Sequence, residues 1–225
     1  MTLPVGTGTL HRPRGRGHVV RSPATGTRQG RSAGHGRDGG GVAAPRAALL
    51  VTAVGCGALS ARPWLLAAFG HPMAVLVSLF AVLLAVSLAW PAAAGATSAP
   101  AAGTAPAASV LFVGVAAFAF GRLLSSGGAR PDPLGLAVAL NTLAAVAEEA
   151  FFRRLVYGIL LRGGAAAAVV GSAVGFAVVH VTVYGTWVLP LDLAAGLVLG
   201  WQRWASGSWR VPALTHVVAN LLVVL

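Results

Sequence analysis

The chain has 225 residues, of which 56% are hydrophobic and 9% are charged. Soluble globular domains carry about a quarter charged residues, so this composition excludes a domain built to face water on all sides. Apolar stretches of transmembrane length recur from about Ala47 to Leu225, and at roughly 20 residues per span they leave room for about six or seven helices. The sequence therefore predicts an all-α, polytopic transmembrane helix bundle.

Residues 1–46 are rich in Gly, Arg, Ser, Thr and Pro and lack apolar periodicity, which predicts a disordered basic tail. The net charge of the chain is +11, and eight of its sixteen basic residues lie between Arg12 and Arg46. This tail has no Phe, Tyr or Trp to stack on bases, so we expect no nucleic-acid partner. The positive-inside rule instead predicts a cytoplasmic N-terminus next to the lipid bilayer.

The region 47–133 is expected to hold N-terminal transmembrane helices and linkers. The apolar runs cover about 47–69, 72–91 and 108–125. The first run contains Arg62 followed by Pro63, so we expect it to be short or broken.

From Leu134 onward, polar side chains occur inside apolar helices. Glu148 and Glu149 are adjacent in the middle of such a helix, where one carboxylate at the bilayer centre costs about 2.5–3.5 kcal/mol. Arg153 follows Glu149 by four residues and can pair with it across one helical turn. Because successive helical residues point about 100° apart, we predict that Glu149 is tied to Arg153 while Glu148 is free for chemistry. A purely structural salt bridge is the alternative for the Glu149–Arg153 pair.

Two histidines, His180 and His216, lie in apolar helices after the glutamates. A lone histidine there is usually a core residue, but ionisable groups inside a membrane indicate function by default. Asn220 follows His216 by four residues on the same helix face, and the two side chains together suit a developing oxyanion. Phe176, one turn before His180, is interpreted as aromatic packing.

The candidate catalytic set comes from three helices: Glu148, Glu149, Arg153, His180, His216 and Asn220. Amide hydrolysis needs a base for water, donors for the oxyanion and an acid for the leaving amine. No serine or cysteine lies in a recognisable nucleophile setting, so water is the expected nucleophile.

Three motifs occur in order on successive helices: EEAFFR (148–153), FAVVH (176–180) and HVVAN (216–220). They match EExxxR, FxxxH and HxxxN, and about 137–225 of the chain thereby resembles the CAAX-protease and bacteriocin-processing family of intramembrane metalloproteases, also called the abortive-infection family. The predicted core that carries these motifs is 134–225. The resemblance implies an intramembrane protease core that cuts a peptide or membrane-protein substrate.

The resemblance also implies roles for individual residues. Glu148 takes the role of the water-activating base, with Glu149 and Arg153 supporting the site. His216 and Asn220 match the last motif and His180 the middle one. As ligands, His180, His216 and Glu148 would suit a zinc ion with an open water position, although the H-E-x-x-H spacing of soluble zinc proteases is absent. A metal-free glutamate mechanism is the alternative.

Two other functions remain open at the level of sequence. A proton-coupled transporter could use Glu148 and His180 as relay groups, and a catalytically inactive scaffold or immunity protein could keep the polar cluster for helix packing. All sixteen basic residues are arginine, and the chain is rich in alanine. This composition is typical of a GC-rich bacterium, so we expect a multi-pass protein of the inner (plasma) membrane. The last apolar run begins near Pro212 and is short for a full span, so we expect it to start inside a cavity or the chain to be slightly truncated.

Overall fold

The protein is described by a computed structural model that covers residues 43–90, 105–124 and 133–224. Within these ranges the chain consists of helices and the turns between them, without strands, which confirms the all-α class. The helices of the N-terminal region are α1 (Ala43–Ser60), α2 (Arg62–Ala68), α3 (Pro72–Ala89) and α4 (Ala107–Leu124).

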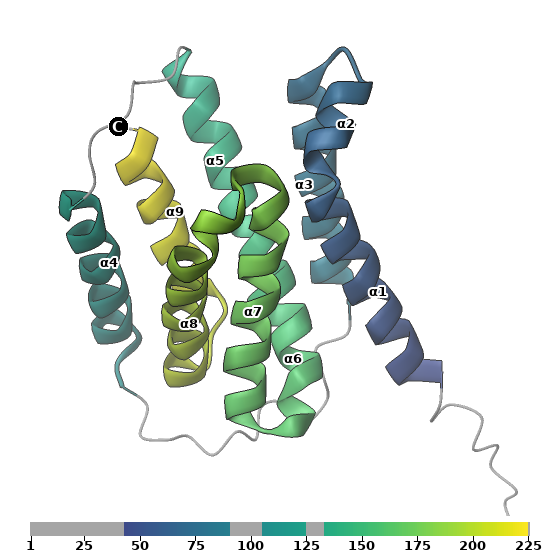
Figure 1. The fold of residues 1–225 in the computed structure, drawn as a ribbon. Coiled ribbons are helices and arrows are strands. Elements are labelled where there is room, and N and C mark those ends of the chain that lie inside the picture. Colours follow the sequence, from purple (N-terminus) through teal and green to yellow (C-terminus); the bar gives the residue numbers. More distant parts are fainter. Residues whose placement is uncertain (1–42, 91–104, 125–132, 225) are drawn as a thin grey trace, which may run out of the picture. The chain divides into compact units, whose positions relative to one another are not determined.

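The C-terminal region begins with one long, modified helix and continues through three more. Its elements are α5 (Leu134–Glu149), the π-helix η2 (Ala150–Val156), α6 (Tyr157–Leu160), the 3₁₀ turn η3 (Leu161–Gly163), α7 (Ala165–Tyr184), the 3₁₀ turn η4 (Thr186–Val188), α8 (Leu189–Ser206) and α9 (Arg210–Val224). Figure 1 shows α5, α7, α8 and α9 gathered together, and α4 packs on α8 and α9.

Residues 1–42 of the predicted basic tail lie outside the described residues. The last four residues of that tail, 43–46, form the first turn of a helix instead. Helix α1 begins at Ala43 rather than near residue 47. Alanine is the strongest helix former, and Pro45 is tolerated because the first turn of a helix leaves its backbone N–H groups unbonded.

The number of spans is lower than the six or seven predicted, although roughly compatible with it. Four described helices are long and apolar enough to cross a membrane, and a fifth span results if the bent pair α1–α2 is counted as one. Helix α9 is apolar but shorter, and α8 carries Asp192 and Arg203 and is not among the candidate spans. The chain is thus a multi-pass membrane protein.

The break predicted at Arg62 and Pro63 is present. Helices α1 and α2 meet at an angle of 57°, and proline occupies the first turn of α2, where its missing N–H costs no helical bond. The bend directs the side chain of Arg62, which is 8% exposed, into the protein rather than toward lipid.

Small residues bring α7 and α8 close together, because glycines four residues apart on one face of a helix let a neighbouring helix approach closely. A Cβ atom at Gly196 would lie 3.0 Å from the Cα of Ala173, and one at Gly200 would lie 3.2 Å from the backbone oxygen of Val169. Neither position has room for a side chain, so these two helices can carry their polar residues, His180 and Asp192, within a few ångströms of each other.

Polar side chains also fasten helices together in the interior. Gln202 of α8 is fully buried and donates from Nε2 to the carbonyl of Val110 in α4 and to the hydroxyl of Thr215 in α9, each at 2.9 Å. Arg154 of η2 donates to the carbonyls of Ser87 and Trp90 at the end of α3. These bonds satisfy polar groups that lipid could not and fix the helices that carry the site.

Candidate active site

The two adjacent glutamates end α5, and the π-helix η2 follows at once. Single π turns within α-helices are rare and occur often at functional sites. The side chains of Glu148 and Glu149 are almost fully enclosed, with 4% and 0% of each residue exposed. They point to different partners, as the 100° step between successive helical residues predicts.

Glu149 is held between an arginine and a histidine. Its Oε2 lies 3.3 Å from Nε of Arg153, and its Oε1 lies 3.1 Å from Nδ1 of His216. Arg153 is itself completely buried, donates to the carbonyl of Gly196 at 3.1 Å and lies over the ring of Phe176 at 4.9 Å. The predicted Glu149–Arg153 pair is therefore present, and it also reaches α9 through His216.

Glu148 has a partner that the sequence does not indicate. Its Oε1 lies 3.4 Å from a terminal nitrogen of Arg62, which comes from α2, 86 positions earlier in the chain. On its other side, Oε2 lies 3.8 Å from Nε2 of His180. Arg62 is fixed by a bond from its Nε to the carbonyl of Leu59 at 2.9 Å. A distant part of the chain therefore supplies a positive charge beside Glu148, and the role of Glu148 in chemistry stays a prediction.

The ring of His180 is oriented by α7 itself. Its Nδ1 lies 2.7 Å from the carbonyl oxygen of Phe176, one turn earlier. Since a carbonyl only accepts hydrogen bonds, Nδ1 carries the proton and Nε2 faces Glu148. The rings of Phe176 and Tyr184 lie on either side in sequence, with centroids 4.5 Å and 5.9 Å from that of His180. Phe176 thus packs against the reactive ring, as interpreted from the sequence.

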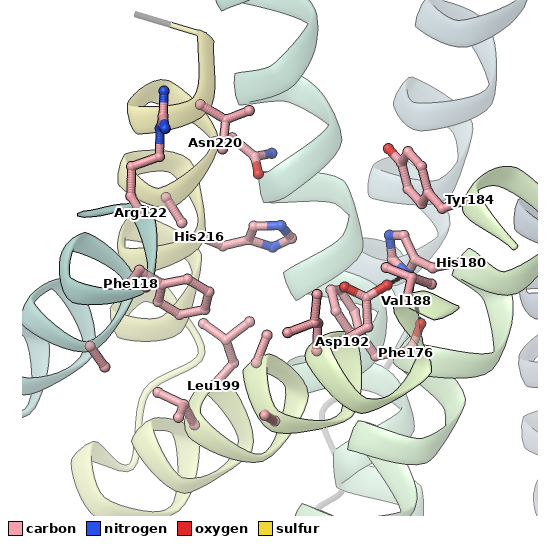
Figure 2. A pocket seen from close by; sticks show the side chains of 18 of the residues that line it. Phe118, Arg122, Phe176, His180, Tyr184, Val188, Asp192, Leu199, His216 and Asn220 are labelled. Carbon is pink, nitrogen blue, oxygen red and sulfur yellow. Dashed lines mark hydrogen bonds and ion pairs between the residues drawn. The ribbon is translucent and has the colours of Figure 1, made fainter. Parts of the chain in front are cut away.

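His216 and Asn220 occupy one face of α9, as predicted. Asn220 donates from Nδ2 to the backbone oxygen of Asn141 in α5 at 3.4 Å. Both residues line a cavity of about 660 Å³, a volume within the range of ligand sites. Figure 2 shows His216 entering this cavity from α9 and His180 from α7, with Asp192 of α8 between them.

The predicted residues therefore form two layers. His180, His216 and Asn220 line the cavity, whereas Glu148, Glu149 and Arg153 lie behind them and are not among its lining residues. Each histidine that faces the cavity has one glutamate behind it. A carboxylate behind an imidazole orients the ring and stabilises its protonated form, which is an arrangement suited to proton transfer and anion stabilisation.

The proposed zinc ligands were tested against the same geometry. The described residues contain no group of three or more His, Cys, Asp or Glu side chains arranged to hold a metal ion. Glu148 lies beside His180, but His216 is turned to Glu149. The residues do not fit a zinc site in this arrangement, so zinc binding stays a prediction and no step of the chemistry is derived from it.

Three site residues were missed from the sequence: Arg62, Asn141 and Asp192. Arg62 is a charge within an apolar run and Asp192 a charge at the start of one, and both could have been flagged as intramembrane ionisable groups. Their contacts with Glu148 and His180 cross between helices, so no spacing in the sequence indicates them. Asn141 lies two turns before Glu148 in α5 and gave no motif.

The fold is that of a polytopic membrane protein, and its helices enclose two glutamate–histidine pairs. Residues 130–222 match a family model described as Type II CAAX prenyl endopeptidase Rce1-like, in agreement with the resemblance that the three motifs indicate. The family supports an intramembrane protease activity with a peptide or protein substrate. Comparison with curated proteins gave no match, and comparison with solved structures gave none.

Replacing Arg62 with methionine should leave Glu148 buried without its guanidinium partner. We expect the variant to lose about 3 kcal/mol of stability, the cost typical of removing one member of a buried ion pair. The double variant Arg62→Met/Glu148→Gln should recover part of that loss, because the uncompensated charge is gone. Thermal unfolding in detergent measures both.

The matched control is Arg46→Met, since Arg46 lies on the exposed face of the neighbouring helix α1 and should change stability little. A double variant that is no more stable than Arg62→Met alone would show that the Arg62–Glu148 contact carries no charge pairing.

Proposed function

We propose that the protein is an intramembrane endopeptidase that hydrolyses a peptide bond in the cavity lined by His180 and His216. The observation that carries this proposal is the pairing of each cavity-facing histidine with a buried glutamate, Glu148 for one and Glu149 for the other. A cavity that places two such pairs around one substrate has a base, an acid and anion-stabilising groups within reach.

Glu148 is proposed to activate the water. Its Oε2 lies 3.8 Å from His180 Nε2, a separation at which a water is expected to take part in the contact. Because Glu148 does not itself line the cavity, this water links it to the substrate: the water oxygen attacks the carbonyl carbon of the scissile bond while one of its protons passes to Glu148. When the carbon–nitrogen bond breaks, Glu148 returns this proton to the leaving nitrogen.

His216 and Asn220 are proposed to stabilise the oxyanion. As the imidazolium, His216 donates from Nδ1 to Glu149 and from Nε2 into the cavity, so one ring can serve both partners. Arg153 holds Glu149 in place from the other side. Asn220, one turn further along α9, supplies the carboxamide as a second donor beside the same cavity.

The substrate is proposed to be a peptide or membrane protein that reaches the cavity from the bilayer. The cavity wall supports this, because apolar residues from α4 and α8, such as Phe118, Val198 and Leu199, line it together with the polar groups. A role in bacteriocin processing or immunity, and a metal requirement, are the finer possibilities that the family resemblance leaves for experiment.

The N-terminus and the end of the glutamate helix are proposed to face the cytoplasm, in the inner membrane of a bacterium. Arg153, Arg154 and Arg162 cluster toward the end of the segment that starts with α5, and Arg46 lies in the first turn of α1. Positive charges at span ends favour the cytoplasmic side.

Purified protein in detergent should cleave members of a quenched-fluorescent peptide library. Glu148→Gln should lower kcat by at least about 10²-fold, because it removes the base, and Asn220→Ala should lower kcat about 10²–10³-fold, because it removes an oxyanion donor. The metal content of the same samples separates a zinc mechanism from one that uses the glutamate alone.

Arg46→Met, away from the site, is the control for folding and should cleave at the wild-type rate. Undiminished cleavage in Glu148→Gln would contradict the proposed base. Absence of cleavage by the wild type, joined to pH-dependent flux in vesicles that does not need Asn220, would replace the protease with a transporter.

The orientation can be read from the two ends of α7. With Cys56 replaced by serine, Arg162→Cys lies just before this 20-residue helix and Thr186→Cys just after it, and both positions are exposed. An impermeant maleimide applied to intact spheroplasts should label the cysteine at 186 and reach that at 162 only after permeabilisation. The reverse pattern would invert the proposed topology.

A further inference from the structure

Asp192 is a carboxylate in the cavity wall that the proposed hydrolysis does not use. It lies in the first turn of α8, and its side chain is 20% exposed. Its Oδ2 is enclosed and has no hydrogen-bond partner among the described residues. The adjacent His180 does not supply one, because its Nδ1 is 3.8 Å from that oxygen and is already bonded to the Phe176 carbonyl at 2.7 Å.

Two aromatic side chains from the segment that leads into α8 line the same cavity. Tyr184 ends α7 and Trp187 lies in η4, and 53% and 68% of these residues are exposed. Figure 2 shows Tyr184 and Asp192 flanking His180 at one side of the cavity. The face of a tyrosine or tryptophan ring attracts a cation. These rings and the carboxylate therefore favour a positively charged ligand.

A carboxylate enclosed by apolar walls is costly unless a cation or hydrogen-bond donors satisfy it. Other polar side chains of the cavity wall do have hydrogen bonds: Asn220 to the Asn141 carbonyl, Arg122 to the Leu222 carbonyl, and His216 to Glu149. Asp192 is the cavity carboxylate left without such a bond among the described residues, and an ammonium or guanidinium group at the exposed part of its side chain would balance its charge.

We propose that Asp192, Tyr184 and Trp187 form a specificity subsite that binds a positively charged side chain, lysine or arginine, of the peptide substrate beside His180. The subsite rests on the proposed protease function and adds a substrate preference to it. None of its three residues belongs to the glutamate, FxxxH or HxxxN motifs.

Binding tests the subsite without cleavage. The full-length Glu148→Gln protein is placed in nanodiscs of phosphatidylglycerol, which has no amine in its headgroup. The ligands are fluorescently labelled apolar nonapeptides that carry a single lysine, norleucine or glutamate at each of the nine positions in turn. Fluorescence anisotropy gives the Kd of each peptide. At one or two adjacent positions we expect lysine to bind about 10–100-fold more tightly than norleucine, as for a charge-assisted pair in a partly buried site.

Variants assign the preference to its residues. Asp192→Asn, which keeps the size of the side chain, should reduce the lysine preference to about threefold or less, and Asp192→Lys should transfer it to glutamate. Trp187→Leu should reduce it about two- to fivefold, which is the scale of an exposed cation–π contact. Thr186→Ala, an exposed neighbour outside the cavity lining, is the control and should keep the preference.

Equal binding of lysine and norleucine peptides at every position, or a preference that survives Asp192→Asn, would overturn the subsite. So would loss of the lysine preference when phosphatidylethanolamine is added, since a lipid ammonium would then be the occupant. A lysine preference in binding together with no cleavage by the wild type would reject the protease and keep the subsite. Cleavage by the wild type without any lysine preference would reject the subsite and keep the protease.

Discussion

The structure depends on the burial of two adjacent negative charges. Glu148 and Glu149 are enclosed among helices, where an unpaired carboxylate costs several kcal/mol. Arg153, on the following turn, is the positive partner of Glu149. The same helix does not present a second positive charge to Glu148, because its side chain points about 100° away from that of Glu149. The second partner, Arg62, comes from the bent helix pair α1–α2, so the N-terminal helices complete the polar centre of a domain that the family model places at 130–222.

The same division of charge organises the cavity. Because Glu148 and Glu149 face different ways, each lies behind a different histidine, His180 from α7 and His216 from α9. Helices α7 and α8 pack closely at Gly196 and Gly200, and this packing brings Asp192 to the same cavity. The two imidazoles thus line a cavity of about 660 Å³ with a mostly apolar wall, while the glutamates behind them are buried. The proposed hydrolysis depends on this separation.

Sequence alone predicted much of this arrangement, and its failures have physical causes. The spans, the Glu149–Arg153 pair and the shared face of His216 and Asn220 follow from periodicity within one helix, which a sequence displays directly. Contacts between helices, such as Arg62 with Glu148, depend on tertiary packing and leave no spacing signal. The π-helix after the glutamates was not predicted either, because its distinct hydrogen-bond register does not correspond to a residue pattern. The four or five candidate spans among the described residues are roughly compatible with the six or seven predicted, and the break at Arg62 and Pro63 shows why apolar length alone does not give the exact number.

The most direct test of this account measures which glutamate is coupled to which histidine. Double-variant cycles would combine Glu149→Gln with His216→Gln and, separately, with His180→Gln, and would follow apparent unfolding free energy in detergent. The account predicts a coupling energy of about 1–3 kcal/mol for Glu149 with His216, as for side chains in direct contact, and less than about 0.5 kcal/mol for Glu149 with His180. Equal coupling in both cycles, or none in the first, would contradict the division of the polar centre into two carboxylate–histidine pairs.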